Sequence, residues 1–175
     1  MSSLQIRKLT YAALFLAIAL VLPFITGQIP EIGAMLSPMH IPVLLCGFFC
    51  GPWYGLVVGF IAPILRFALF GMPPLMPGGI AMAFELATYG FLSGLLYKLL
   101  PKKIPYIYVS LIGAMLAGRV VWGVARAVIA GVTNAQFGME AFLAGAFINA
   151  VPGIILHIVL IPAIVIALRK YTAKE

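Results

Sequence analysis

Long apolar runs alternate along the whole chain with short stretches rich in glycine, proline or charge. A helix needs about 20 apolar residues to cross the hydrocarbon core of a bilayer, and most of the runs approach or exceed that length. The pattern predicts an all-α integral membrane protein in which residues 1–175 form a single transmembrane domain of six helices. The helices are expected over Leu9 to Thr26, Pro38 to Cys50, Tyr54 to Phe70, Gly79 to Leu100, Tyr106 to Gly131 and Ala144 to Leu168.

The second segment, Pro38 to Cys50, is shorter than the others. At 1.5 Å per residue it spans about 20 Å, against about 30 Å for the hydrocarbon core, so we expect it to begin deep in the membrane or irregularly. The dipeptide Gly51-Pro52 follows it directly and is typical of a tight turn. The second and third segments are therefore predicted to form a helical hairpin.

Basic residues occur at alternate connections between the segments. Eight of the eleven lie before the first segment, at or after the end of the fourth, or after the sixth: Arg7, Lys8, Lys98, Lys102, Lys103, Arg169, Lys170 and Lys174. The connections of the other side, residues 27–37, 71–78 and 132–143, contain no lysine or arginine. The positive-inside rule therefore predicts that both termini are cytoplasmic. The external connection 71–78 contains three prolines and is either a stiff lid over a cavity or a plain connector.

Composition agrees with a membrane protein and excludes other classes. The chain is 64% hydrophobic and 9% charged with a mean hydropathy of +1.17, whereas soluble domains are about half apolar and a quarter charged. The net charge of +7 does not indicate nucleic-acid binding, because the basic residues form no patch interleaved with aromatics. Cys46 and Cys50 share one helix face but have no nearby His, Asp or Glu, so we expect packing, no metal site and no cofactor.

Small residues recur at a spacing of four, which lets helices approach closely. Gly51, Gly55 and Gly59 form one such series. Ala13 and Ala17 form another, on a helix whose remaining surface is large and apolar. The pattern by itself favours packing within the bundle for this pair, with contact to another membrane subunit as the alternative.

Three arginines remain inside the predicted helices, at positions 66, 119 and 126. An ionised group in the membrane costs at least about 2.5–3.5 kcal/mol on insertion scales, so each is a candidate for function. Counting 1.5 Å per residue from the helix ends brings five polar side chains to a common level one to two turns below the external surface. They come from five different helices: His40, Arg66, Glu85, Arg126 and Asn149.

Helical spacing predicts that these residues share faces that line one cavity. Arg119, Trp122 and Arg126 lie on one stripe, while Glu85 shares a stripe with Tyr89. We expect Glu85 to neutralise one arginine, with Arg66 preferred, which leaves cations that a carboxylate ligand would satisfy. Trp122 and Tyr89 would form its walls. The structural alternative is an ion pair that only clamps helices. His157 is interpreted as a residue satisfied within the bundle.

Catalysis is not expected. The chain contains no aspartate, and Gly90-Phe91-Leu92-Ser93-Gly94 departs by one residue from the Gly-x-Ser-Gly spacing of rhomboid-type serine proteases. No Walker motif is present, so any ATP would be used by partner subunits. A secondary carrier would show an inverted repeat, and the sequence contains no evident one.

Two longer motifs resemble the substrate-binding S components of energy-coupling factor (ECF) vitamin transporters. They are the run from Met39 to Pro52, MHIPVLLCGFFCGP, and the run from Met82 to Gly90, MAFELATYG. The six helices, the short second helix and the Ala13-x-x-x-Ala17 face are similar as well, and the resemblance covers essentially the whole chain. Within the family these runs are most similar to the pantothenate-type members.

The resemblance implies high-affinity capture of a small water-soluble vitamin, most plainly pantothenate, from the external side of a prokaryotic plasma membrane. It also implies that the first helix, through Ala13 and Ala17, contacts a membrane coupling subunit that carries two ATPase subunits. Alternatives are an S component for pyridoxine-like compounds, folate or hydroxymethylpyrimidine, or a carrier outside the ECF family. The expected binding residues are Arg126, Glu85, Arg66, Asn149, His40, Trp122, Tyr89 and Arg119.

Overall fold

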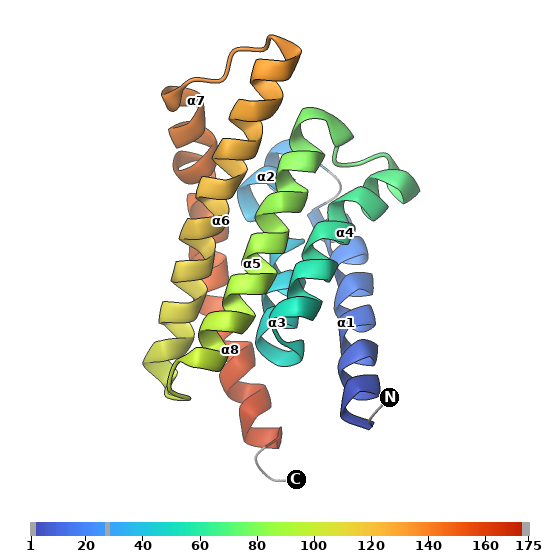
Figure 1. The fold of residues 1–175 in the computed structure, drawn as a ribbon, viewed down its shortest axis with the longest axis vertical. Coiled ribbons are helices and arrows are strands. Elements are labelled where there is room, and N and C mark those ends of the chain that lie inside the picture. Colours follow the sequence, from blue (N-terminus) through green and yellow to red (C-terminus); the bar gives the residue numbers. More distant parts are fainter. Residues whose placement is uncertain (1–2, 27–28, 173–175) are drawn as a thin grey trace.

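The computed structural model describes residues 3–26 and 29–172, and every element in these ranges is helical (Figure 1). All six predicted segments are confirmed as helical. The elements are α1 (Ser3–Val21), η1 (Leu22–Thr26), α2 (Pro30–Leu36), α3 (His40–Cys50), α4 (Pro52–Phe70), η2 (Leu75–Gly79), α5 (Ile80–Leu99), α6 (Ile104–Thr133), α7 (Met139–Leu143), η3 (Ala144–Ile148) and α8 (Val151–Thr172).

Two parts of the chain differ from the helices and loops that the sequence predicts. Residues 27–37, expected as a loop, contain the short helix α2, which begins with Pro30 at its first position. The last segment, expected as one regular helix from Ala144, is instead divided. A π-helical turn at η3 and a further turn at residues 149–150 precede α8. Composition predicted neither the helix α2 in the external connection nor the point at which the last segment departs from regular α-helical geometry.

Within the described residues, five stretches are long and apolar enough to cross a membrane: Ser3–Ile25, Pro52–Phe70, Leu75–Leu99, Ile104–Thr133 and Met139–Arg169. The chain is therefore a multi-pass membrane protein. The apolar helix α3 is too short to cross the membrane in the same way. With 11 residues, α3 extends for about 16 Å, and every residue in it except Phe49 is buried. Its complete burial explains why its sequence is apolar on all sides. Gly51, at φ 103°, then allows the sharp turn into α4, and the predicted hairpin is present.

Glycines bring α4 and α5 into backbone contact. A Cβ added to Gly90 would lie 2.1 Å from the carbonyl oxygen of Gly55, and one added to Gly55 would lie 2.3 Å from the carbonyl oxygen of Gly90. A side chain at either position would therefore force the two helices apart. The predicted small-residue face is thus an internal packing surface.

Replacing Gly90 with alanine is expected to destabilise the protein by about 1–3 kcal/mol, because the added methyl group overpacks this contact. The measurement is thermal and denaturant unfolding of the purified protein in detergent. Gly131→Ala is the matched control, since it makes the same substitution in a helix where nothing lies within 4 Å of the added Cβ. Equal stability of the two variants would contradict the close approach.

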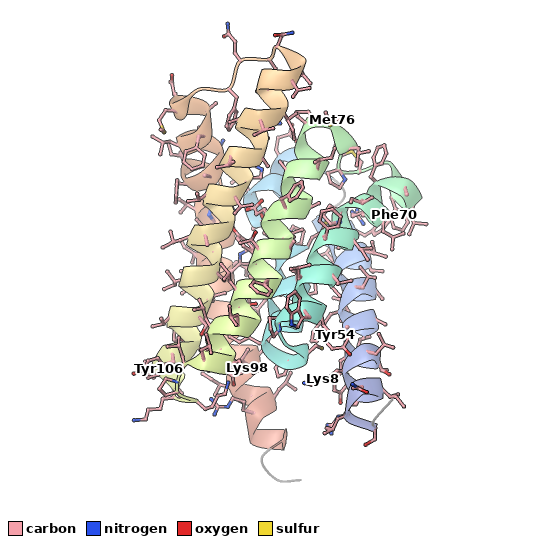
Figure 2. The ribbon with its side chains drawn as sticks, in the orientation of Figure 1. Lys8, Tyr54, Phe70, Met76, Lys98 and Tyr106 are labelled. Carbon is pink, nitrogen blue, oxygen red and sulfur yellow. The ribbon has the colours of Figure 1, made fainter. Side chains whose placement is uncertain are left out.

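The two chain ends lie at the same end of the molecule (Figure 1). Lys8 and Lys98 are at that end, whereas Phe70 and Met76 are at the opposite one (Figure 2). The guanidinium of Arg169 donates a hydrogen bond of 2.8 Å to the carbonyl of Lys102, which ties α8 to the α5–α6 turn. Lys174 and the side chain of Lys170 lie outside what the structure describes. The clustering of the basic residues that are described agrees with the charge pattern used to predict orientation.

Ala13 and Ala17 are both exposed on the outer surface of α1. The alanines that α1 buries are Ala12 and Ala19. Packing of Ala13 and Ala17 within the bundle, which the spacing favoured, is therefore wrong. Spacing of four identifies a common face of the helix but does not indicate whether that face points inward or outward.

Candidate functional site

A cavity of about 320 Å³ lies between the beginning of α3 and the α4–α5 connection. The cavity therefore lies toward the end of the molecule where Met76, a residue of the same connection, is found (Figure 2). Its walls come from nearly every element of that half of the protein: Pro23, Ile29, Gly33, Ser37, Pro38, Met39, His40, Arg66, Met72, Pro73, Pro74, Met82, Glu85, Arg119, Trp122 and Gly145. The shortness of α3 makes the cavity possible, because the helix begins beneath it.

Glu85 is the centre of the polar groups in the cavity wall. Its Oε1 lies 2.9 Å from Nη1 of Arg119 and 3.6 Å from Nε2 of His40. Glu85 and His40 are each 2% exposed and Arg119 is 7% exposed. The same Oε1 accepts no well-aligned hydrogen bond from the described residues, so its attraction to Arg119 is mainly electrostatic. This oxygen is itself buried, so it faces Arg119 and His40 and not the open space of the cavity.

The predicted pairing of Glu85 with Arg66 is wrong. Arg66 instead donates from Nη1 to the carbonyl of Leu20, in the last turn of α1. Its guanidinium carbon lies 4.9 Å from the ring centroid of Phe24 and 5.3 Å from that of Phe70. Arg66 is only 2% exposed and lines the cavity. It therefore presents a desolvated cation on the wall.

His40 joins the cavity to a layer of buried side chains beneath it. Its ring stacks on that of His157, with centroids 5.9 Å apart, and meets the edge of Tyr89 at 5.3 Å. Tyr89 has no exposed surface, and His157 has 1%. The sequence interpretation set His157 aside as a packing residue, and its stacking beneath the site is a contact that only the fold reveals.

Five of the eight predicted binding residues line the cavity: His40, Arg66, Glu85, Arg119 and Trp122. Three do not. Tyr89 lies below it, and Arg126 stacks behind Trp122, with its guanidinium carbon 5.9 Å from that ring centroid. Asn149 is exposed, because the turn that follows η3 changes the direction in which this part of the chain faces.

Several lining residues were not predicted as binding residues. Ser37 and Gly145 belong to types that are common in packed helices, and Met39 and Met82 were noted only as parts of the two motifs that carry the resemblance. The connection from Met72 to Pro74 was recognisable, since its prolines suggested a stiff cover, and these residues do line the cavity. Among the described residues, no group of three His, Cys, Asp or Glu side chains could hold a metal ion.

One comparison with known proteins identifies a family. The family model of the ECF transporter substrate-specific component matches residues 7–168. No curated protein and no solved structure matches the chain significantly. Since the match covers nearly the whole sequence and all the residues of the cavity, the chain belongs to the ECF transporter substrate-specific component family, whose members are micronutrient-uptake subunits of membrane transporters.

Proposed function

We propose that this chain captures a small carboxylate-bearing vitamin, with pantothenate as the first candidate, for an ATP-driven ECF importer. The observation that carries the proposal is the charge of the cavity. Two arginines and one glutamate line it, which leaves an excess of one positive charge among the described residues. A bound carboxylate would supply the missing negative charge and match the planar donors of a guanidinium.

The positions of the charges favour Arg66 as the group that receives the carboxylate. Arg119 already has Glu85 as its partner at 2.9 Å, whereas Arg66 contacts a neutral carbonyl and two aromatic rings. The positive end of the α3 dipole adds to the potential, because the first turn of α3 forms part of the wall. Arg126, which the sequence also predicted as a ligand contact, has less support because it does not line the cavity.

Size and lining also support pantothenate. A volume of about 320 Å³ is at the small end of the ligand-pocket range of about 300–1,000 Å³. Folate has more than twice as many non-hydrogen atoms as pantothenate and fits this volume less well. The methionines and prolines of the wall suit the two methyl groups of pantothenate.

Calorimetric titration of the detergent-purified chain tests the proposal directly. Pantothenate is expected to bind saturably with submicromolar affinity, and pyridoxine, hydroxymethylpyrimidine, folate and thiamine serve as comparators. Tight binding of a neutral comparator in place of pantothenate would retain a capture subunit but overturn the carboxylate assignment. A folded sample that binds none of them would remove the support for pantothenate and for all the comparators. A carrier outside the ECF family is not retained, because the family is shown.

The cavity is proposed to face the external side, with six helical passes counting α3 and with both termini in the cytoplasm. This orientation follows from the basic residues at the opposite end of the molecule. Release inside the cell would require the partners that ECF transporters use, a membrane coupling subunit and two ATPases.

Ala13 and Ala17 are proposed as part of the contact with the coupling subunit, since both are exposed on α1. Replacing both with leucine is expected to abolish co-purification with that subunit while leaving pantothenate affinity unchanged. The physical reason is that small residues allow close helix approach and large ones prevent it. Ala127→Leu, an exposed alanine on α6, is the matched control. Normal co-purification of the variant with both alanines replaced would show that this face does not contact the coupling subunit.

A further inference from the structure

Trp122 links the cavity wall to the segment that follows α6. Its ring lines the cavity, and it packs against two aromatic side chains from that segment. The edge-on contact with Phe137 has a centroid distance of 5.9 Å, and the nearly parallel contact with Phe142, on α7, has one of 6.4 Å. A displacement of the indole would therefore change both the cavity and the packing of the α6–α7 connection.

The six-membered ring of the indole lies close to Gly145. A Cβ added there would lie 2.7 Å from Cη2 of Trp122, which is closer than real Cβ contacts. Any larger residue at this position would push the indole away from η3.

Arg126 lies one helical turn after Trp122 and on the same face of α6. Its guanidinium carbon is 5.9 Å from the ring centroid of Trp122 and 5.3 Å from that of Phe137. Its Nε is buried and has no hydrogen-bond partner among the described residues. A guanidinium within about 6 Å of two aromatic rings is attracted by both, and more strongly where water is excluded.

We propose that Arg126 is a positioning residue that holds Trp122 in the cavity wall and fastens the α6–α7 connection through Phe137, without touching the captured vitamin. Arg126, Trp122 and Phe137 form an aromatic clamp. The clamp sets the shape of the site on which the proposed capture function rests. It also explains why an arginine is retained in the membrane behind the cavity, where it does not line the ligand space.

The fluorescence of Trp122 provides a test that does not depend on the ligand. The chain has two tryptophans, and Trp53 is 70% exposed at the other end of the molecule, so Trp53→Phe leaves Trp122 as the single reporter. In this full-length background, Arg126→Leu is expected to change the Trp122 emission and increase its quenching by acrylamide. Pantothenate affinity is expected to fall about two- to thirtyfold, the range of strengths of a cation–π contact. Arg126→Lys retains a cation and is expected to recover most of both signals.

Gly145→Ala disturbs the position of Trp122 without changing Arg126 and does not depend on the folding of an Arg126 variant. It is expected to shift Trp122 emission and weaken pantothenate binding, whereas Gly138→Ala, where nothing lies within 4 Å of the added Cβ, should change neither. Unchanged Trp122 emission and quenching in Arg126→Leu would overturn the inference. Equal weakening of pantothenate binding by leucine and lysine at position 126, with unchanged emission, would also overturn it and indicate direct ligand contact. If the parent protein binds no pantothenate, the proposed ligand fails, but the fluorescence still decides whether the clamp exists.

Discussion

Replacement of Glu85 with glutamine is expected to destabilise the protein by about 3–5 kcal/mol, the usual cost of removing one partner of a buried ion pair. The carboxylate is 2% exposed and is the acidic partner of Arg119 in the described part of the chain. Glutamine has nearly the same shape but no charge, so the guanidinium would remain buried without compensation. The change in stability therefore reports the loss of the charge and not a change in the packing of α5 against α6.

Unfolding of the purified variants in detergent measures this effect, and a second substitution identifies its cause. Adding Arg119→Met to Glu85→Gln removes the uncompensated cation and is expected to recover most of the lost stability. Glu140→Gln, which changes an exposed carboxylate on α7, is the matched control and should have little effect. If the double variant were no more stable than Glu85→Gln, the loss would have to come from packing or from His40.

Replacement of Arg66 with alanine is expected to weaken pantothenate binding by about 1.5–3 kcal/mol, the strength of a hydrogen bond to a charged group, which is about a tenfold to hundredfold change. Arg66 lines the cavity as a buried cation that contacts a backbone carbonyl and two aromatic rings. Arg66→Lys keeps the charge but loses the planar fork of donors, so we expect an intermediate affinity.

The alcohol analogue of pantothenate, pantothenol, separates loss of carboxylate binding from a general change in the cavity. In the parent protein, pantothenol is expected to bind more weakly than pantothenate, because it lacks the carboxylate. In Arg66→Ala, calorimetry should show nearly equal affinities for the two compounds, since the group that distinguishes them is gone. A variant that still prefers pantothenate by the parental ratio would assign the carboxylate to another residue.

Much of the site could be predicted because depth in a membrane helix follows from position along the chain. Each residue adds a fixed rise, so the ends of the apolar runs place His40, Arg66 and Glu85 at similar depth. All three line one cavity in the structure. The cost of burying charge also identifies the arginines as unusual without any structural information.

The choice of partners could not be predicted in the same way. The rotation of each helix about its axis and the neighbours it packs against decide which side chains meet. Arg66 meets the carbonyl of Leu20 and the rings of Phe24 and Phe70, and Glu85 pairs with Arg119 of the adjacent α6. Asn149 follows a π-helical turn, and that irregularity turns it outward.

The sequence by itself determined the helical membrane class, the six apolar segments and the residues that carry charge into the bilayer, because these properties depend on local composition and on the cost of desolvation. The tertiary structure decided that α3 begins beneath a cavity, that Ala13 and Ala17 face outward, and that the guanidinium of Arg126 lies near the Trp122 ring. These features depend on contacts between residues far apart in the chain. A periodic pattern defines a face of a helix, but only packing determines what that face meets.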